Sequence, residues 1–148
     1  MDERLGFVED AGLYFERLGF SRTAGRIMGW LLTADDDGAD APEMCAALGV
    51  AKSSVSVALR RLEPAGLVER FRVAGQRRDR YRLTEDVFGR AFRAQMEVLP
   101  AFVELADRGL AVVGDDPARR RRLENMREMY AFMARRFPRL LDEWEAGR

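Results

Sequence analysis

The chain has 148 residues, a length typical of a single domain. Hydrophobic residues make up 47% of it, a proportion typical of globular proteins. It contains no histidine and only one cysteine, Cys45, so it lacks the commonest general base, the commonest metal ligand and any internal disulfide. No apolar run approaches the roughly 20 residues that cross a bilayer, and the start of the chain does not resemble a signal peptide. These features argue against an enzyme, a bound cofactor or metal and a membrane protein, and they favour a cytoplasmic location.

Charge is distributed unevenly along the chain, although the 25 basic and 25 acidic side chains cancel overall. Residues 1–51 carry four basic and ten acidic side chains, residues 52–82 carry nine and three, and residues 83–148 carry twelve of each. The middle segment therefore has a net charge of +6 in an otherwise acidic or neutral chain. Arginines seen singly are usually just solvated, but such a cluster predicts contact with nucleic acid.

Two helices are predicted in the N-terminal segment. Apolar residues at steps of three and four over residues 3–18 indicate an amphipathic helix, which Gly19 ends. Ser21 is a suitable N-cap for a second helix, and the acidic run at residues 34–38 follows it. This run lacks the alternating order of a calcium loop, so we interpret it as a solvated turn.

A helix-turn-helix is predicted in the middle of the chain. Asp40 and Pro42 are typical of a helix start, and the short helix over residues 43–48 ends at Gly49. A second helix follows almost at once, over residues 52–63. Two helices joined by a tight glycine turn are the signature of this motif.

The outer face of this second helix is suited to the major groove of DNA. Small hydroxyls and arginines can enter the groove, where arginine pairs with guanine and valine contacts thymine methyl groups. The residues predicted to contact bases are Ser53, Ser56, Val57, Arg60 and Arg61.

A small β-hairpin is predicted directly after the helix-turn-helix. Residues 67–73 and 80–84 have the alternating pattern of strands, and the hydrophilic residues 74–79 form the tip between them. No other strand is evident from the sequence.

The C-terminal part is predicted to be helical. Thr84 is expected to cap a long helix that continues to Leu110 with a bend at Pro100. A last helix is expected to begin at Pro117 and to bend at Pro138. Its regular apolar seam requires a partner helix, either in a second subunit or in the first helix of the chain.

Two segments of the motif, residues 49–56 (GVAKSSVS) and 59–70 (LRRLEPAGLVER), resemble the winged helix-turn-helix of the MarR superfamily of transcriptional regulators. Residues 20–32 (FSRTAGRIMGWLL) resemble the GbsR-like branch, so the resemblance covers about residues 7–84. It implies a mainly α fold with a small β-hairpin wing. The winged helix-turn-helix would be flanked by dimerisation helices.

The implied domain organisation has three parts. Residues 1–20 form an N-terminal dimerisation helix, residues 21–84 form the winged helix-turn-helix, and residues 85–148 form a C-terminal helical dimerisation region. The residues expected at the dimer interface are Leu5, Val8, Phe15, Leu123, Met126, Tyr130, Met133 and Phe137.

The resemblance also assigns contacts to DNA outside the base-reading face. Lys52 and Ser54 would meet phosphates where the recognition helix enters the groove. Arg77, Arg78 and Arg80 are similar to the minor-groove probe of the family wing. The family usually has an aspartate shortly before its wing arginine, whereas here the acid comes after Arg77 and Arg78, so which arginine enters the groove is left open.

Two further features complete the comparison with the family. Ala51 stands where relatives often carry a serine that caps the recognition helix, so this cap is lost unless Ser53 or Ser54 substitutes. The GbsR-like resemblance implies an effector site between the DNA-binding and dimerisation parts, although core packing is the simpler interpretation of each aromatic residue. The candidates for this pocket are Tyr14, Trp30, Phe71 and Phe88.

The sequence therefore predicts a transcriptional regulator that binds double-stranded DNA as a homodimer on a palindromic operator. Repression by steric occlusion is the simplest mode of action, and a small-molecule effector is an additional expected partner. The alternative is a winged-helix module that binds protein without specific DNA binding, which the absence of salt-sensitive duplex binding would favour. An enzyme is a distant third hypothesis, because no catalytic constellation is recognisable.

Overall fold

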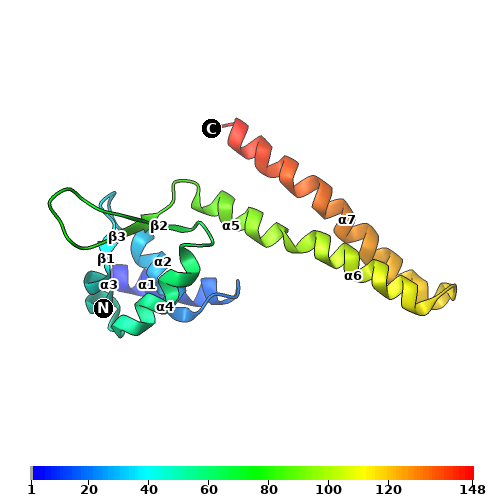
Figure 1. Cartoon of the computed structure of the whole chain (residues 1–148), viewed down its shortest axis with the longest axis horizontal. Coiled ribbons are helices and arrows are strands. Elements are labelled where there is room, and N and C mark those ends of the chain that lie inside the picture. Colours follow the sequence, from blue (N-terminus) through cyan, green and yellow to red (C-terminus); the bar gives the residue numbers. More distant parts are fainter. Residues whose placement is uncertain (1) are drawn as a thin grey trace. The chain divides into compact units, whose positions relative to one another are not determined.

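The computed structural model describes residues 2–148, which are mostly helical with one small antiparallel sheet (Figure 1). The chain divides into two compact units, residues 1–90 and 91–148. The first unit contains α1 (Glu3–Glu16), α2 (Arg22–Leu32), β1 (Ala39–Asp40), α3 (Ala41–Leu48), α4 (Lys52–Leu62), β2 (Val68–Phe71) and β3 (Arg80–Leu83). Helix α5 (Val87–Met96) spans the boundary, and the second unit continues with α6 (Val98–Val113) and α7 (Pro117–Ala146).

Helices α1 and α2 approach each other closely because glycines lie where they cross. A Cβ atom added at Gly29 would lie 2.6 Å from the Cβ atom of Ala11, and one added at Gly25 would lie 2.9 Å from the Cα atom of Gly12. Distances of this kind leave no room for a side chain at either glycine of α2. The sequence pattern predicted both helices, and these glycines determine how near they come.

The core of the first unit is formed by the apolar faces of its helices and strands. Its largest fully buried side chains are Ile27, Met28, Met44, Leu62, Val8 and Val55. Val8 is therefore a core residue of its own chain, which corrects its expected place at a dimer interface. The α1 helix buries this side chain against α2, where the two helices cross.

The helix-turn-helix has the start and turn that the sequence predicts. Asp40 and Glu43 form a reciprocal capping box, in which the Asp40 carboxylate accepts from the Glu43 amide at 2.8 Å and the Glu43 carboxylate accepts from the Asp40 amide at 3.0 Å. Gly49 ends α3 with a φ of 64°, a left-handed conformation that suits glycine. Helix α4 begins three residues later and ends at Leu62.

The sheet has three strands in the order β1-β3-β2, whereas the sequence predicts only the hairpin of β2 and β3. The additional strand, β1, has two residues, which is too short to produce an alternating pattern. It pairs antiparallel with β3, so that Asp40 lies opposite Arg80. Gly38 precedes it with a φ of 61°, and a Cβ atom there would collide with the carbonyl oxygen of Tyr81.

Two expectations for the segment after the hairpin are wrong. Thr84 does not cap a helix, because its hydroxyl donates to the carbonyl oxygen of Gly66 at 2.8 Å, and α5 begins only at Val87. The long helix predicted up to Leu110 is two helices, α5 and α6, separated at Glu97. Pro100 explains the break, because it has no N–H group to donate to the Met96 carbonyl and its ring crowds that carbonyl.

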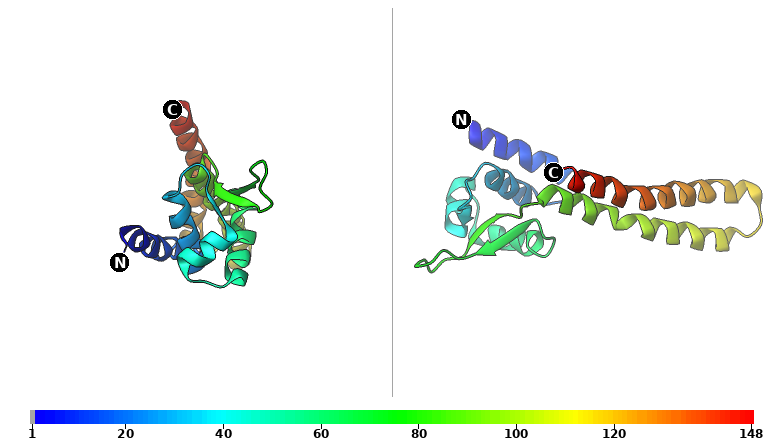
Figure 2. Two further views of the ribbon diagram at one scale, coloured as in Figure 1. Left: turned by 90° about the vertical axis from the view of Figure 1, so that its left-hand side faces the viewer. Right: turned by 90° about the horizontal axis from the view of Figure 1, so that it is seen from above.

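The second unit is built on a hairpin of two long helices, α6 and α7, which lie side by side (Figure 2). The Phe102 and Tyr130 rings stack with their centroids 4.6 Å apart, and Leu123 packs over Gly109. Part of the seam predicted on the last helix is therefore covered by α6 of the same chain. Helix α7 runs unbroken through Pro138.

The hairpin has little buried core of its own. Within residues 91–148, all of which are described, only Leu99 and Ala106 are buried.

Among residues 2–148, no helix combines the length and the apolar character that crossing a bilayer requires.

The crossing of α1 and α2 generates a prediction about stability. Gly29→Ala is expected to lower the free energy of unfolding by about 1–3 kcal/mol, because the added methyl group has no space. Gly6→Ala in α1 is the matched control, since a Cβ atom there meets nothing within 4 Å. It is expected to raise stability by about 0.5–1 kcal/mol through helix propensity. Urea unfolding followed by circular dichroism measures both, and equal effects of the two substitutions would contradict the close crossing.

Candidate nucleic-acid interface

Helix α4 separates apolar and polar residues onto opposite faces. Val55, Ala58, Leu59 and Leu62 are buried and hold the helix on the core. The opposite face is exposed, and it carries Lys52, Ser53, Ser56, Val57, Arg60 and Arg61. Ser54 is half-buried at the edge of this face. The structure thus brings together the residues predicted for the recognition helix on one accessible surface.

The N-terminus of α4 has no side-chain cap. Ala51 occupies the N-cap position, and no side-chain hydrogen bond forms there, so neither Ser53 nor Ser54 substitutes for the missing serine. The start of α2 lies beside it, and a shallow cavity of about 280 Å³ joins the two helix starts. Ser21, the N-cap of α2, and Thr23 of α2 line this cavity together with Ser53 and Ser54 of α4. The sequence does not show that Ser21 and Thr23 belong to this site, because only the fold places them beside α4.

The two arginines at the tip of the wing are exposed to solvent. Arg77 and Arg78 are exposed, and the nearest acid to Arg78 is Asp40, 3.8 Å from its guanidinium. Asp79 instead pairs with Arg72 at 2.7 Å, and Arg70 lies 3.6 Å away from the same carboxylate. The hydrogen bond from Arg72 lowers the pKa of Asp79 below its usual value. The acid of the wing therefore neutralises arginines of its base, whereas Arg78 at the tip remains 69% exposed despite its long ion pair with Asp40.

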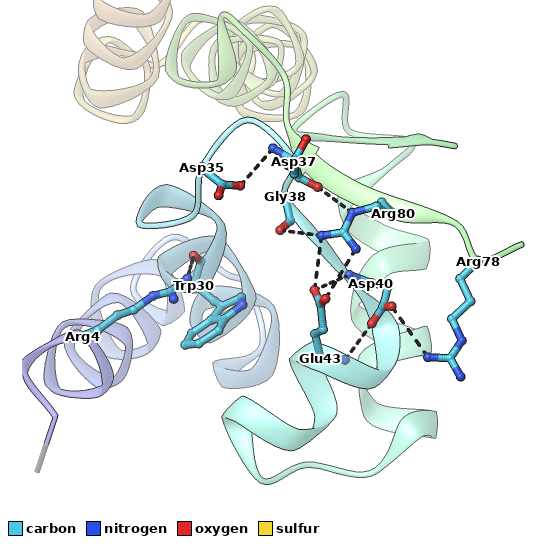
Figure 3. A network of polar contacts seen from close by, with 9 residues as sticks. All are labelled: Arg4, Trp30, Asp35, Asp37, Gly38, Asp40, Glu43, Arg78 and Arg80. Carbon is cyan, nitrogen blue, oxygen red and sulfur yellow. Dashed lines mark hydrogen bonds and ion pairs between the residues drawn. The ribbon is translucent and has the colours of Figure 1, made fainter. Parts of the chain in front are cut away.

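Arg80 has a structural role that the sequence analysis missed, and this corrects its expected place among the minor-groove arginines. Figure 3 shows its guanidinium turned toward the start of α3, where it donates to the carbonyl oxygens of Asp37 at 2.8 Å and Gly38 at 3.2 Å. Both oxygens of the Glu43 carboxylate lie 3.4 Å from the same guanidinium. Its side chain is only 14% exposed. Arg80 thus joins the root of the wing to the first helix of the motif.

A second partly buried arginine links α1 to the helix-turn-helix. Arg26 of α2 pairs with Glu9 of α1 at 2.7 Å and donates to the carbonyl oxygen of Leu48 at 2.8 Å. Leu48 is the last residue of α3, so this bond satisfies a helix-end carbonyl just before the turn into α4. The position of the recognition helix is therefore linked to α1 through one side chain.

The residues expected in an effector pocket are not gathered in one cavity. Tyr14 is 65% exposed and lies under Arg17, whereas Phe71 lies under Arg82 and Phe88 is exposed. Trp30 is covered by Arg4, whose guanidinium lies 3.4 Å from the ring centroid (Figure 3). Each aromatic ring thus has separate surroundings, and for three of them those surroundings include an arginine.

The residues expected at a dimer interface have different environments. On α1, Leu5 and Phe15 are half-buried, and the Phe15 ring meets that of Phe20 edge-on at 6.3 Å. The five seam residues of α7, from Leu123 to Phe137, are all half-buried. Helix α6 of the same chain covers part of this seam, where Leu123 packs over Gly109 and Tyr130 stacks on Phe102.

Comparison with known proteins shows the family to which this chain belongs. The profile described as the MarR family matches residues 18–79, and that of the MmpR5-like MarR family transcriptional regulators matches residues 86–147. The chain is 39% identical over 128 residues to the HTH-type transcriptional regulator MmpR5 of Mycobacterium tuberculosis (strain ATCC 25618 / H37Rv). This match covers 86% of the chain and 78% of that protein. The chain belongs to the MarR family.

A solved structure supports the same fold for the whole MarR-family chain. The crystal structure of a transcriptional regulator superposes on it with a TM-score of 0.81 and 35% sequence identity. The superposition covers 97% of this chain and 99% of the other. The protein is accordingly a DNA-binding transcriptional regulator with a winged helix-turn-helix, and it is not an enzyme.

The contacts of Arg80 generate a second prediction. Arg80→Gln is expected to lower the free energy of unfolding by about 1–3 kcal/mol, because it removes charge-assisted hydrogen bonds from two backbone carbonyls and Glu43. Arg78→Gln, at a side chain that is 69% exposed, is the control and should change stability by no more than about 0.5 kcal/mol. Thermal and urea unfolding of both variants test this role. A stable Arg80→Gln variant would show that the guanidinium does not hold the wing root.

Proposed function

We propose that this MarR-family protein binds a palindromic operator as a homodimer and represses transcription by occluding it. The observation that carries the proposal is the exposed face of α4, which combines hydroxyls, a valine and two arginines opposite a fully buried apolar face. A helix held this firmly on its core can present a fixed set of groups to the major groove. A regulator that binds chromosomal DNA in this way acts in the bacterial cytoplasm.

In this proposal the residues of α4 have two different tasks. Arg60 and Arg61, with Ser53, Ser56 and Val57, contact base edges in the major groove. Lys52 and Ser54 contact phosphates and fix the register of the helix on the duplex without specifying sequence.

The shallow cavity beside α4 extends the phosphate contacts. Ser21 and Thr23 line it from the start of α2, so a phosphate there would meet hydroxyls from two helices. The amides of the first turn of α4, which lack a side-chain cap, would then have an anionic acceptor.

The wing contributes a separate contact in the minor groove. Arg77 and Arg78 are the proposed probes, because they are exposed at the tip while Asp79 neutralises the arginines at the base. A narrow A·T-rich groove has an enhanced negative potential, which attracts such guanidinium groups. Arg80 is left out of this contact because its side chain is held at the wing root.

Dimerisation is proposed from apolar side chains that the single chain leaves uncovered. The outer face of α7 exposes Met129, Phe132, Leu140 and Trp144, each at 45–60%. Helix α1 similarly exposes Phe7 and Leu13, the turn after it exposes Leu18, and Leu5 and Phe15 of α1 are half-buried. Apolar side chains that are exposed together on one surface commonly mark interaction sites. In the three-part organisation predicted from the sequence, both helices belong to dimerisation segments.

The symmetry of a homodimer constrains the operator. Two recognition helices related by a two-fold axis require half-sites about 10 bp apart, or a whole multiple of that spacing.

Two further parts of the proposal rest on the sequence. The protein responds to a small-molecule effector, and it belongs to the GbsR-like branch, which residues 20–32 resemble.

The DNA contacts are tested on an operator selected from random duplex DNA. Arg60→Ala or Arg61→Ala is expected to cost about 1–3 kcal/mol on this operator and to relax preference at one base position per half-site. Lys52→Ala is the matched control, because a phosphate contact should weaken binding to all sequences alike. Fluorescence anisotropy with operator and random duplexes of equal length measures these affinities.

The salt dependence of the same titrations supplies an independent test. Contact with roughly eight phosphates by the dimer gives a log-log slope of affinity against salt near −7. A flat salt response, or equal losses on both duplexes for all three variants, would refute the proposed interface.

The dimer is tested by light scattering over a dilution series. Phe132→Glu is expected to shift the protein toward monomer, because it places a charge in the outer face of α7. Val112→Glu makes the same chemical change at a side chain that is 85% exposed on α6, and it should leave assembly unchanged. A wild-type protein that remains monomeric at micromolar concentration would contradict the dimer and the palindromic operator together.

A further inference from the structure

Phe20 lies in the turn between α1 and α2, and the backbone before it closes the end of α1. Its N–H group donates to the carbonyl oxygen of Phe15 at 3.3 Å, and that of Gly19 donates to the carbonyl oxygen of Glu16 at 3.1 Å. With a φ of 91° at Gly19, these bonds form a Schellman motif, in which an apolar side chain after the glycine commonly packs back on the helix. The Phe20 ring does so, because it meets the Phe15 ring edge-on at 6.3 Å.

The residue after Phe20 begins the next helix. The Ser21 hydroxyl accepts from the Ala24 amide at 3.1 Å and caps α2. Phe20 is thus held between a closed helix end and a capped helix start. Its ring is half-buried, so part of it packs inside the protein and part remains accessible. The turn therefore presents an aromatic surface whose position is fixed by its backbone.

Arg61 of α4 is the side chain that lies over this ring. Its guanidinium carbon is 6.0 Å from the ring centroid, at the outer limit of a cation–π contact. Helices α2 and α4 pack together, and the shallow cavity beside α4 also places Ser21 next to that helix. Within residues 2–148 no carboxylate forms an ion pair with Arg61. A ring, rather than an acid, is therefore the partner that the chain provides for this arginine.

The kind of partner matters because a ring leaves the donors of an arginine free. A guanidinium has five N–H groups, and a carboxylate partner accepts from some of them, as Asp79 does from Arg72. An aromatic face attracts the positive charge without accepting those bonds. Arg61 can thus be held in place and still donate to both major-groove acceptors of a guanine.

Arg60, its neighbour in the sequence, has a different support. Its Nε group donates to the carbonyl oxygen of Ser56 in the same helix, at 3.4 Å. That contact moves with α4, whereas Phe20 belongs to the turn between α1 and α2. Of the two arginines proposed to contact bases, Arg61 is therefore the one whose position depends on a residue outside the helix-turn-helix.

We propose that Phe20 is a positioning residue for DNA recognition, which holds the Arg61 guanidinium over its ring and so determines the base that this arginine contacts. This role rests on the proposed function, in which Arg61 contacts a base edge in the major groove. Phe20 acts through Arg61, because it restricts the rotamers that the arginine adopts before DNA binds. Fewer rotamers in the free protein mean that less side-chain entropy is lost on binding.

The test removes the ring and keeps an apolar side chain. Phe20→Leu is expected to weaken binding to the selected operator about two- to fivefold, as the loss of an exposed cation–π contact should, and to leave binding to random duplex DNA unchanged. It should relax preference at the same base position that Arg61→Ala relaxes. Phe20→Tyr, which keeps the ring, should retain that preference. Fluorescence anisotropy with operators substituted at this position measures these effects.

A double-mutant cycle shows whether Phe20 acts through Arg61. In the Arg61→Ala background, Phe20→Leu is expected to cause no further loss, because the guanidinium that it supports is already absent. Tyr14→Leu is the matched control, since it removes a ring of α1 that also has an arginine, Arg17, 5.0 Å from its centroid. It should leave operator affinity and base preference unchanged.

Circular dichroism establishes that each variant is folded, and Phe20→Met is a second variant without a ring should Phe20→Leu fail to fold. Intact base preference in these variants, alongside relaxed preference in Arg61→Ala, overturns the role of Phe20 and leaves the proposed function standing. Equal losses on operator and random DNA, or additive losses in the double variant, also overturn it, because they indicate a purely structural role. Unchanged preference in Arg61→Ala overturns the assignment of Arg61 to a base contact, and the role of Phe20 with it.

Discussion

The close crossing of α1 and α2 is the constraint on which the first unit depends. Because Gly25 and Gly29 have no side chains, the two helix backbones come near enough for Glu9 to pair with Arg26 at 2.7 Å. The same guanidinium then reaches the carbonyl oxygen of Leu48, at the end of α3. A wider separation of α1 from α2 would remove one of these contacts. The position of α4 therefore depends partly on the absence of side chains at Gly25 and Gly29, which lie outside the helix-turn-helix.

Acidic residues decide which arginines of the positive segment remain available. Asp79 forms ion pairs with Arg70 and Arg72 at the base of the wing, and Glu43 forms an ion pair with Arg80 at its root. The remaining positive charge is concentrated on the exposed face of α4 and at the wing tip. A net charge of +6 over residues 52–82 therefore overstates how many groups can meet phosphate, and the positions of the carboxylates matter as much as the number of arginines.

Local signals made the helices of the motif predictable, while contacts between distant residues did not show in the sequence. Asp40 and Gly49 have cap chemistry that depends on a few neighbouring residues, so both ends of α3 could be placed. The exposed face of α4 followed from helical periodicity for the same reason. Arg80 was misassigned because its acceptors are up to 43 residues away, and Val8 because an apolar stripe does not show what covers it. Strand β1 is too short for any pattern.

The thin core of the second unit has a consequence for how the protein folds. No residue of α7 is fully buried, although the helix has 30 residues, so the hairpin gains little from its own interior. In the proposed homodimer, most of the stabilisation of this part would come from contact with the second copy. Folding and assembly would then be one equilibrium governed by mass action, and the melting temperature would rise with protein concentration. The amount of regulator in the cell would set how much of it is folded, as well as how much is bound to DNA.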